Sequence, residues 1–187
     1  MFDGLKLDGY GAILIDPPWR FATYDKRKHV GRGKPHYRTL STTEIIRLPF
    51  YKLTAANCAV FVWVSWPQLD DALRAIAQWG LSYKTCAFCW IKSTGSGAPA
   101  IGTGFWTRAN SEVCLLATCG HPKRLSRSVP QVIVEPRREH SRKPDCVRGR
   151  IERLVGGPYL EVFARSRRPG WDACGDEIDR FQEREAV

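Results

Sequence analysis

At residues 12–19 the chain reads AILIDPPW, in which an unbroken apolar run, Ala12–Ile15, leads directly into Asp16, two prolines and Trp19. A short apolar run of this kind predicts a buried strand, which we place at Tyr10–Ile15. Each proline fixes its φ at about −65° and lacks a backbone N–H. We therefore expect a buried strand that ends in a stiff turn, with carbonyls that point outward and no N–H competing beside them.

This turn is rich in hydrogen-bond acceptors. The Asp16 carboxylate and the Pro17 carbonyl together suit a planar NH₂ group, and Trp19 beside them would stack on the ring that carries it. In the alternative interpretation the prolines only end the strand and Trp19 fills the core. The residue types favour a site that holds the exocyclic amine of a nucleobase.

Strands and helices alternate along the rest of the chain. We predict further strands at Ala59–Val64, Ser82–Ile91, Glu112–Thr118, Gln131–Glu135 and Tyr159–Ala164. Helices are predicted at Thr42–Tyr51, Pro67–Trp79 and Pro144–Leu154, with a last short helix at Asp176–Arg184. This order predicts one α/β domain over residues 1–187, with a largely parallel sheet covered on both faces. Ligands bind such sheets at the carboxyl ends of strands, where Asp16 falls.

The chain is strongly basic. Its 29 Lys and Arg against 19 Asp and Glu give a net charge of +10. The positive charge concentrates between Arg20 and Arg38 and between His121 and Arg150. Basic loops beside an amine-holding turn favour a polyanionic partner attracted through its phosphates; the alternative is a merely basic, soluble surface.

The cysteines and the N-terminal residues bear on the cellular compartment. Seven cysteines without a signal-peptide pattern predict reduced thiols in an intracellular, cytoplasmic protein. No run of about 18 apolar residues exists, so we expect no membrane span. Cys86 and Cys89 have metal-ligand spacing, but they lie in an apolar strand and no second such pair follows, so we expect no metal.

The tetrad Asp16-Pro17-Pro18-Trp19 resembles the signature of amino-methyltransferases that use S-adenosyl-L-methionine (AdoMet) to methylate N6 of adenine. From about residue 9 to about residue 180 the chain resembles one branch of them, the MT-A70 family. The stretches that carry this resemblance are His36–Ser41, Val60–Val64, Trp90–Lys92, Gly102–Trp106, Glu112 with Leu115 and Leu116, Ser141–Asp145, Ile151–Leu154, Leu160–Arg165, Pro169–Trp171 and Gly175–Glu177.

The resemblance implies a Rossmann-like class I AdoMet-dependent methyltransferase sheet in permuted order, with the catalytic tetrad first and the AdoMet-binding strand late. It implies the following site residues: catalytic Asp16, Pro17, Pro18 and Trp19; substrate-binding Tyr37, Glu112 and Lys143; and AdoMet-binding Asp16, Lys143, Phe163, Arg165, Asp176 and Glu177. The chain has Phe163-Ala164-Arg165 where a glycine-rich turn is commoner. The family's upstream acid near the cofactor adenine would be Asp3 or Asp8.

The expected activity is N6-adenine methyl transfer to nucleic acid, with DNA favoured because a compact chain is similar to bacterial or phage members of the family. Three alternatives remain open: an RNA substrate, a different acceptor such as cytosine N4 or a free nucleotide, and a catalytically inactive nucleic-acid-binding subunit. The resemblance also implies that the chain works as a homo- or hetero-dimer in some settings.

Overall fold

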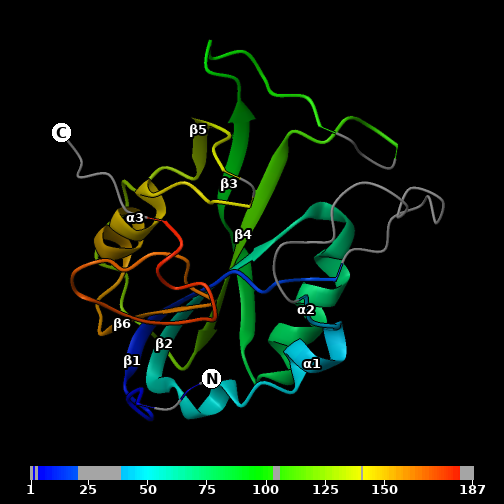
Figure 1. Cartoon of the computed structure of the whole chain (residues 1–187). Helices are drawn as coiled ribbons and strands as arrows, with labels where there is room; N and C mark the ends of the chain where they lie inside the picture. Colours follow the sequence, from blue (N-terminus) through cyan, green and yellow to red (C-terminus); the bar gives the residue numbers. More distant parts are fainter. Residues whose placement is uncertain (1, 3, 21–38, 103–105, 140, 182–187) are drawn as a thin grey trace.

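The computed structural model describes residues 2, 4–20, 39–102, 106–139 and 141–181 (Figure 1). Its centre is a seven-stranded sheet of order β5-β3-β4-β2-β1-β6-β7. The strands are β1 (Tyr10–Ile15), β2 (Thr54–Val64), β3 (Ser82–Ser93), β4 (Ser111–Cys119), β5 (Val132–Pro136), β6 (Tyr159–Val162) and β7 (Trp171–Cys174). Within the described residues β4 alone runs antiparallel to its neighbours. The predicted α/β class with a mostly parallel sheet is confirmed.

Helices cover both faces of this sheet. On one face, α1 (Thr42–Ile46) and α2 (Leu69–Gln78) pack on a core that includes Ile13 and Ile15. On the other face, α3 (Cys146–Leu154) packs on a core that includes Ala12 and Leu14. The two cores alternate along β1 because successive side chains of a strand point to opposite faces, and Figure 1 shows the helices on either side of the strands.

Helix boundaries lie at a capping box and near prolines. Ser41 and Glu44 form a capping box that starts α1. The predicted helix Thr42–Tyr51 is wrong in its second half, because the residue before Pro49 is disfavoured in helical geometry, and the chain restarts as a 3₁₀ turn over Phe50–Lys52. The predicted starts of α2 at Pro67 and of α3 at Pro144 are two residues early. Pro67 belongs to a 3₁₀ turn, Trp66–Gln68, that precedes α2, and the first helical residue after Pro144 is Cys146.

Several strand ends also differ from the expectation. β2 begins five residues before Ala59, and β7 was not expected at all. β6 ends at Val162 because Phe163 adopts a φ of 61°, which leaves the strand region. In place of the predicted helix from Asp176, residues 176–180 form hydrogen-bonded turns, and residues 182–184 lie outside the described part.

The strand register brings distant residues to one edge of the sheet. Ile15 pairs with Val62 of β2 and with Val162 of β6, so these three strands end together. β3 runs in the same direction as β2, and β4 starts where β3 ends. The carboxyl edge therefore gathers the residues after β1, β2, β3 and β6 and the first residues of β4. None of the described helices has the length and the hydrophobicity that a membrane span requires.

Candidate active site

The turn after β1 is fixed by backbone hydrogen bonds on both sides. Trp19 N donates to Pro17 O at 2.8 Å, and Leu40 N donates to Pro18 O at 2.8 Å. The expectation that no N–H competes for these carbonyls is therefore wrong. The N–H of Trp19 occupies one site on the Pro17 carbonyl, and the N–H of Leu40 occupies one site on the Pro18 carbonyl. A carbonyl oxygen has two lone pairs, so Pro17 O keeps capacity for a second donor.

Trp19 lies in the core beneath this turn. It is 5% exposed, and its Nε1 donates to the backbone oxygen of Trp63 at 3.2 Å. A ring buried to this extent offers little face to a base. The structure thus favours the alternative in which Trp19 packs in the core, although it also lines the cleft described below.

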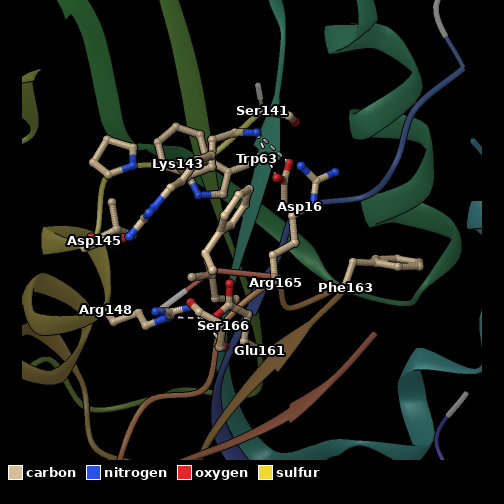
Figure 2. Close-up of a pocket in the computed structure, with 15 residues that line it drawn as sticks. Asp16, Trp63, Ser141, Lys143, Asp145, Arg148, Glu161, Phe163, Arg165 and Ser166 are labelled. Carbon is tan, nitrogen blue, oxygen red and sulfur yellow. Dashed lines mark hydrogen bonds and ion pairs between the residues drawn. The ribbon is translucent and has the colours of Figure 1, made fainter. Parts of the chain in front are cut away.

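Four charged side chains of alternating sign form a line along the carboxyl edge. Lys143 Nζ donates to both carboxylate oxygens of Asp16, at 2.9 and 2.8 Å, and lies 3.4 Å from Glu112 Oε2. The other oxygen of Glu112 accepts from Lys92 Nζ. Figure 2 shows the Lys143 ammonium group facing the Asp16 carboxylate. The structure thus joins three expected site residues, Asp16, Glu112 and Lys143, in one network.

Burial and opposite charges act against each other in this network. Burial lowers the pKa of Lys143, but the Asp16 and Glu112 carboxylates outweigh it, and the pKa lies above its ordinary value. Burial raises the pKa of Glu112, but Lys143 and Lys92 outweigh it, and the pKa lies below its ordinary value. Both groups are therefore charged at neutral pH.

Two residues of this region were not expected as site residues. Lys92 pairs with Glu112 and lies 5.2 Å from the ring centroid of Trp90; the signal that would have found it is a lone basic residue at the carboxyl end of a strand. Trp63 is 1% exposed and lies under Lys143, with Nζ 5.8 Å from its ring centroid. Its indole N–H is the one buried side-chain N or O without a hydrogen-bond partner among the described residues.

The segment after β6 supplies the expected cofactor-side residues. Arg165 Nε lies 3.3 Å from Glu177 Oε2, and the Phe163 ring points away from the Asp16–Lys143 pair (Figure 2). Gly175 packs so closely that an added Cβ would lie 2.8 Å from the Ala164 oxygen. Asp176 is exposed, and neither Asp176 nor Glu177 lines a hollow of the site; Glu177 reaches it only through its ion pair with Arg165.

Two hollows meet at the Asp16–Lys143 pair. The first is an open cleft of about 910 Å³ lined by the tetrad, Trp90, Lys92 and Glu112. The second is a narrow pocket of about 40 Å³ lined by Phe163, Ser166 and Phe181. Asp16, Lys143 and Arg165 line both. Both hollows therefore open onto the same ion pair, and the cleft is the one with room for a ligand.

The residues fit AdoMet by their chemistry. Asp16 offers hydrogen-bond acceptors to the ammonium group of AdoMet, and Lys143 offers donors to the carboxylate of AdoMet. The Arg165–Glu177 pair offers donors and acceptors to the ribose hydroxyls. The unpaired N–H of Trp63 marks a place where a bound acceptor is favourable, because an unsatisfied buried donor costs about 1–3 kcal/mol. The narrow pocket alone is too small for such a molecule, whereas the cleft is as large as common ligand sites.

Of the remaining expected residues, Tyr37 and Asp3 lie outside the described residues, as do positions 21–38 of the basic stretch. Asp8 precedes β1 and its N–H donates to Lys52 O. It is therefore at the opposite edge of the sheet from Asp16, about 20 Å along a six-residue strand, which excludes it as an acid at the carboxyl edge. The described residues contain no group of three or more potential metal ligands.

Several known proteins are similar to this chain in sequence. The chain is 30% identical to the type II methyltransferase M.MunI of a Mycoplasma species, over 95% of this chain and 82% of that protein. It is 30% identical to the N(6)-adenine-specific methyltransferase METTL4 of Mus musculus, over 92% of this chain and 38% of that protein. It is 31% identical to the N6-methyladenosine RNA methyltransferase MTA1 of Pyricularia oryzae, over 94% of this chain and 48% of that protein. The chain thus spans less than half the length of the latter two. A family model described as MT-A70 matches residues 10–177, and the chain belongs to this family of methyltransferases.

Proposed function

We propose that the chain transfers a methyl group from AdoMet to N6 of adenine in nucleic acid, with DNA as the favoured substrate. The observation that carries the proposal is the Asp16–Lys143 ion pair in the wall of an open cleft of about 910 Å³. A transfer between two molecules needs a site where both are held with their reacting atoms in contact, and a cleft of this size with oriented charges suits that need.

The chemical problem at N6 is a lone pair delocalised into the purine ring. AdoMet supplies an electrophilic methyl group on a sulfonium. Asp16 and the Pro17 carbonyl would each accept a hydrogen bond from one N6–H. These bonds localise the N6 lone pair and orient it towards the methyl group. Lys143 fixes the orientation of the Asp16 carboxylate through both oxygens. A carboxylate has about four lone-pair sites, so it can hold Lys143 and the amine together.

The proton that N6 loses on methylation has Asp16 as the nearest anionic acceptor in this arrangement. Glu112 is the second anion of the cleft, held by Lys92 and Lys143. Most of the rate enhancement would come from positioning and from preorganised charges rather than from a strong base. A target base leaves its stack to reach the cleft, at a cost of a few kcal/mol.

The preference for DNA rests on one relative, the type II methyltransferase of a Mycoplasma species, which is 30% identical over 95% of this chain. RNA remains the second candidate, because the identities are equally high. An inactive nucleic-acid-binding subunit is less well supported, since the tetrad and Lys143 are intact and lie together.

The test is methyl transfer from labelled AdoMet to DNA and RNA oligonucleotides of matched sequence, with the product nucleoside identified by mass spectrometry. We expect N6-methyladenine on DNA. Product on RNA alone would keep the chemistry and refute the substrate preference. A methyl group on cytosine, or no transfer together with no AdoMet binding, would refute the proposed function.

A further inference from the structure

Trp66 stands at the rim of the cleft directly after β2. It is 50% exposed, although the residues beside it, Ser65 and Gln68, line the cleft. On its other side the indole Nε1 donates to Ser111 Oγ at 2.9 Å, and Ser111 precedes Glu112 of the cleft wall. A large aromatic side chain thus lies at the mouth of the site and half in solvent.

The surroundings hold this indole in place. Trp66 begins a 3₁₀ turn with Pro67 as its second residue. Ser65 Oγ donates to Gln68 Oε1 at 2.9 Å, and Gln68 Nε2 donates to Arg20 O at 3.3 Å, so the turn is tied to the tetrad segment. Trp66 belongs to neither hydrophobic core cluster. The fold therefore does not account for the exposed ring, whose N–H is already satisfied and whose free surface is apolar.

The charge of the cleft indicates what would cover that surface. Cationic side chains line the cleft in excess over acidic ones: Lys92, Arg137, Arg138, Arg142, Lys143 and Arg165 against Asp16, Glu112 and Glu139. A ligand that offers both anionic groups and flat rings fits a rim of this kind. Single-stranded nucleic acid has both, and base stacking on an aromatic side chain is worth about 1–3 kcal/mol per base, whatever the base.

We propose that Trp66 is a stacking platform for a nucleobase that neighbours the target adenine. This inference rests on the proposed function, because it takes the cleft as the place of the target. β1 and β2 end side by side, because Ile15 pairs with Val62. Asp16 is the residue after Ile15, and Trp66 is the fourth residue after Val62. Trp66 therefore lies at the same edge of the sheet as Asp16, where a strand whose target base reaches Asp16 can place a flanking base on the indole ring.

The test is a double-mutant cycle on binding affinity that needs no catalysis. The ligands are a single-stranded oligonucleotide with one adenine and the same strand in which all nucleotides except that adenosine are abasic. The two strands carry equal phosphate charge and differ only in the flanking bases. We expect Trp66→Ala to weaken binding of the intact strand about 5- to 150-fold and to leave binding of the abasic strand unchanged. Trp66→Phe, which keeps a flat ring, retains most of the affinity.

Tyr83→Ala is the matched control. Tyr83 is 48% exposed, but it lies seven residues before Trp90, the first residue of β3 that lines the cleft, a separation of about 23 Å. Its loss changes neither affinity. Equal weakening of both strands by Trp66→Ala, or none, would overturn the inference. So would a dimer of the wild type that Trp66→Ala converts to monomer, because Trp66 would then be a protein interface.

Methyl transfer on the intact strand separates this inference from the proposed function. If the wild type transfers no methyl group but Trp66 still distinguishes intact from abasic strand, the stacking platform stands and the proposed function fails. If transfer occurs and the cycle shows no coupling, the proposed function stands and Trp66 is not a platform.

Discussion

Replacing Lys143 by Met tests the charge network of the site. Methionine keeps much of the length and removes the charge, leaving Asp16 and Glu112 as neighbouring carboxylates without the cation between them. Removing one partner of a fully buried pair costs about 3–5 kcal/mol. The side chains of Lys143, Asp16 and Glu112 are 16%, 19% and 22% exposed, so water in the cleft recovers part of this. We expect Lys143→Met to lower the free energy of unfolding by about 2–3 kcal/mol at neutral pH.

The destabilisation caused by Lys143→Met should depend on pH. In the wild type the pKa of Glu112 is lowered despite its burial, because two ammonium groups face it. Its stabilising contribution is present above the unfolded pKa of about 4.3 and is lost as the pH falls through the folded pKa. In Lys143→Met the carboxylates repel each other, and protonating one relieves the repulsion. The deficit of the variant therefore shrinks as the pH falls from about 7 to about 4.

The assay is urea unfolding of both proteins over this pH range, with comparable m-values as a check that the transition is the same. Arg167→Met is the matched control, since Arg167 pairs with Asp179 at 2.9 Å but both side chains are well exposed; such pairs contribute about 0–1 kcal/mol. A Lys143→Met deficit no larger than that of the control, or one that grows towards low pH, would refute the reasoning.

Three further predictions concern the supporting structure. Arg148 is 8% exposed and paired with Glu161, so Arg148→Met should lower the free energy of unfolding by about 3–5 kcal/mol. Adding Glu161→Gln should restore part of this loss, and equal stability of Arg148→Met and the wild type in urea would contradict the prediction. Gly175→Ala should destabilise by about 1–3 kcal/mol because its Cβ meets backbone atoms of Ala164, whereas Gly95→Ala, with open space around it, should be near neutral, as thermal melting would measure. Burial raises the pKa of Cys58 to about 12, and burial together with the neighbouring Glu135 carboxylate raises that of Cys146 to about 12. Alkylation followed by mass spectrometry should therefore leave both thiols unmodified in the native state at neutral pH and label both in urea; rapid native labelling of Cys58 would show that the strand is open.

The sequence was sufficient where local pattern and position agree. The apolar run before Asp16 predicted β1, and the rule that parallel sheets bind ligands at carboxyl ends predicted where the tetrad lies. The helix cores were also predictable, because α2 repeats its apolar residues at helical spacing. Their ends were not, since the effect of a proline such as Pro49 depends on whether the chain restarts as a 3₁₀ turn.

Other features depend on contacts that sequence spacing does not reveal. Strand β7 has four residues, one of them Asp172, and it is recognisable only by its pairing with β6. The contact of Lys143 with Asp16 joins residues 127 positions apart, so only the sheet order places them together. Trp19 was expected to face a ligand, but the chain folds back at Leu40 and buries it.

The central claim is that the Asp16 carboxylate directs methyl transfer at the carboxyl end of β1. The most direct measurement is the single-turnover rate of methyl transfer to an oligonucleotide by the wild type and Asp16→Ala, with the AdoMet dissociation constant of each measured beside it. We predict that Asp16→Ala abolishes transfer, whereas AdoMet binding weakens only by the loss of the ammonium contact, because Lys143 and Arg165 remain. A rate in the variant comparable to that of the wild type would contradict the role of Asp16.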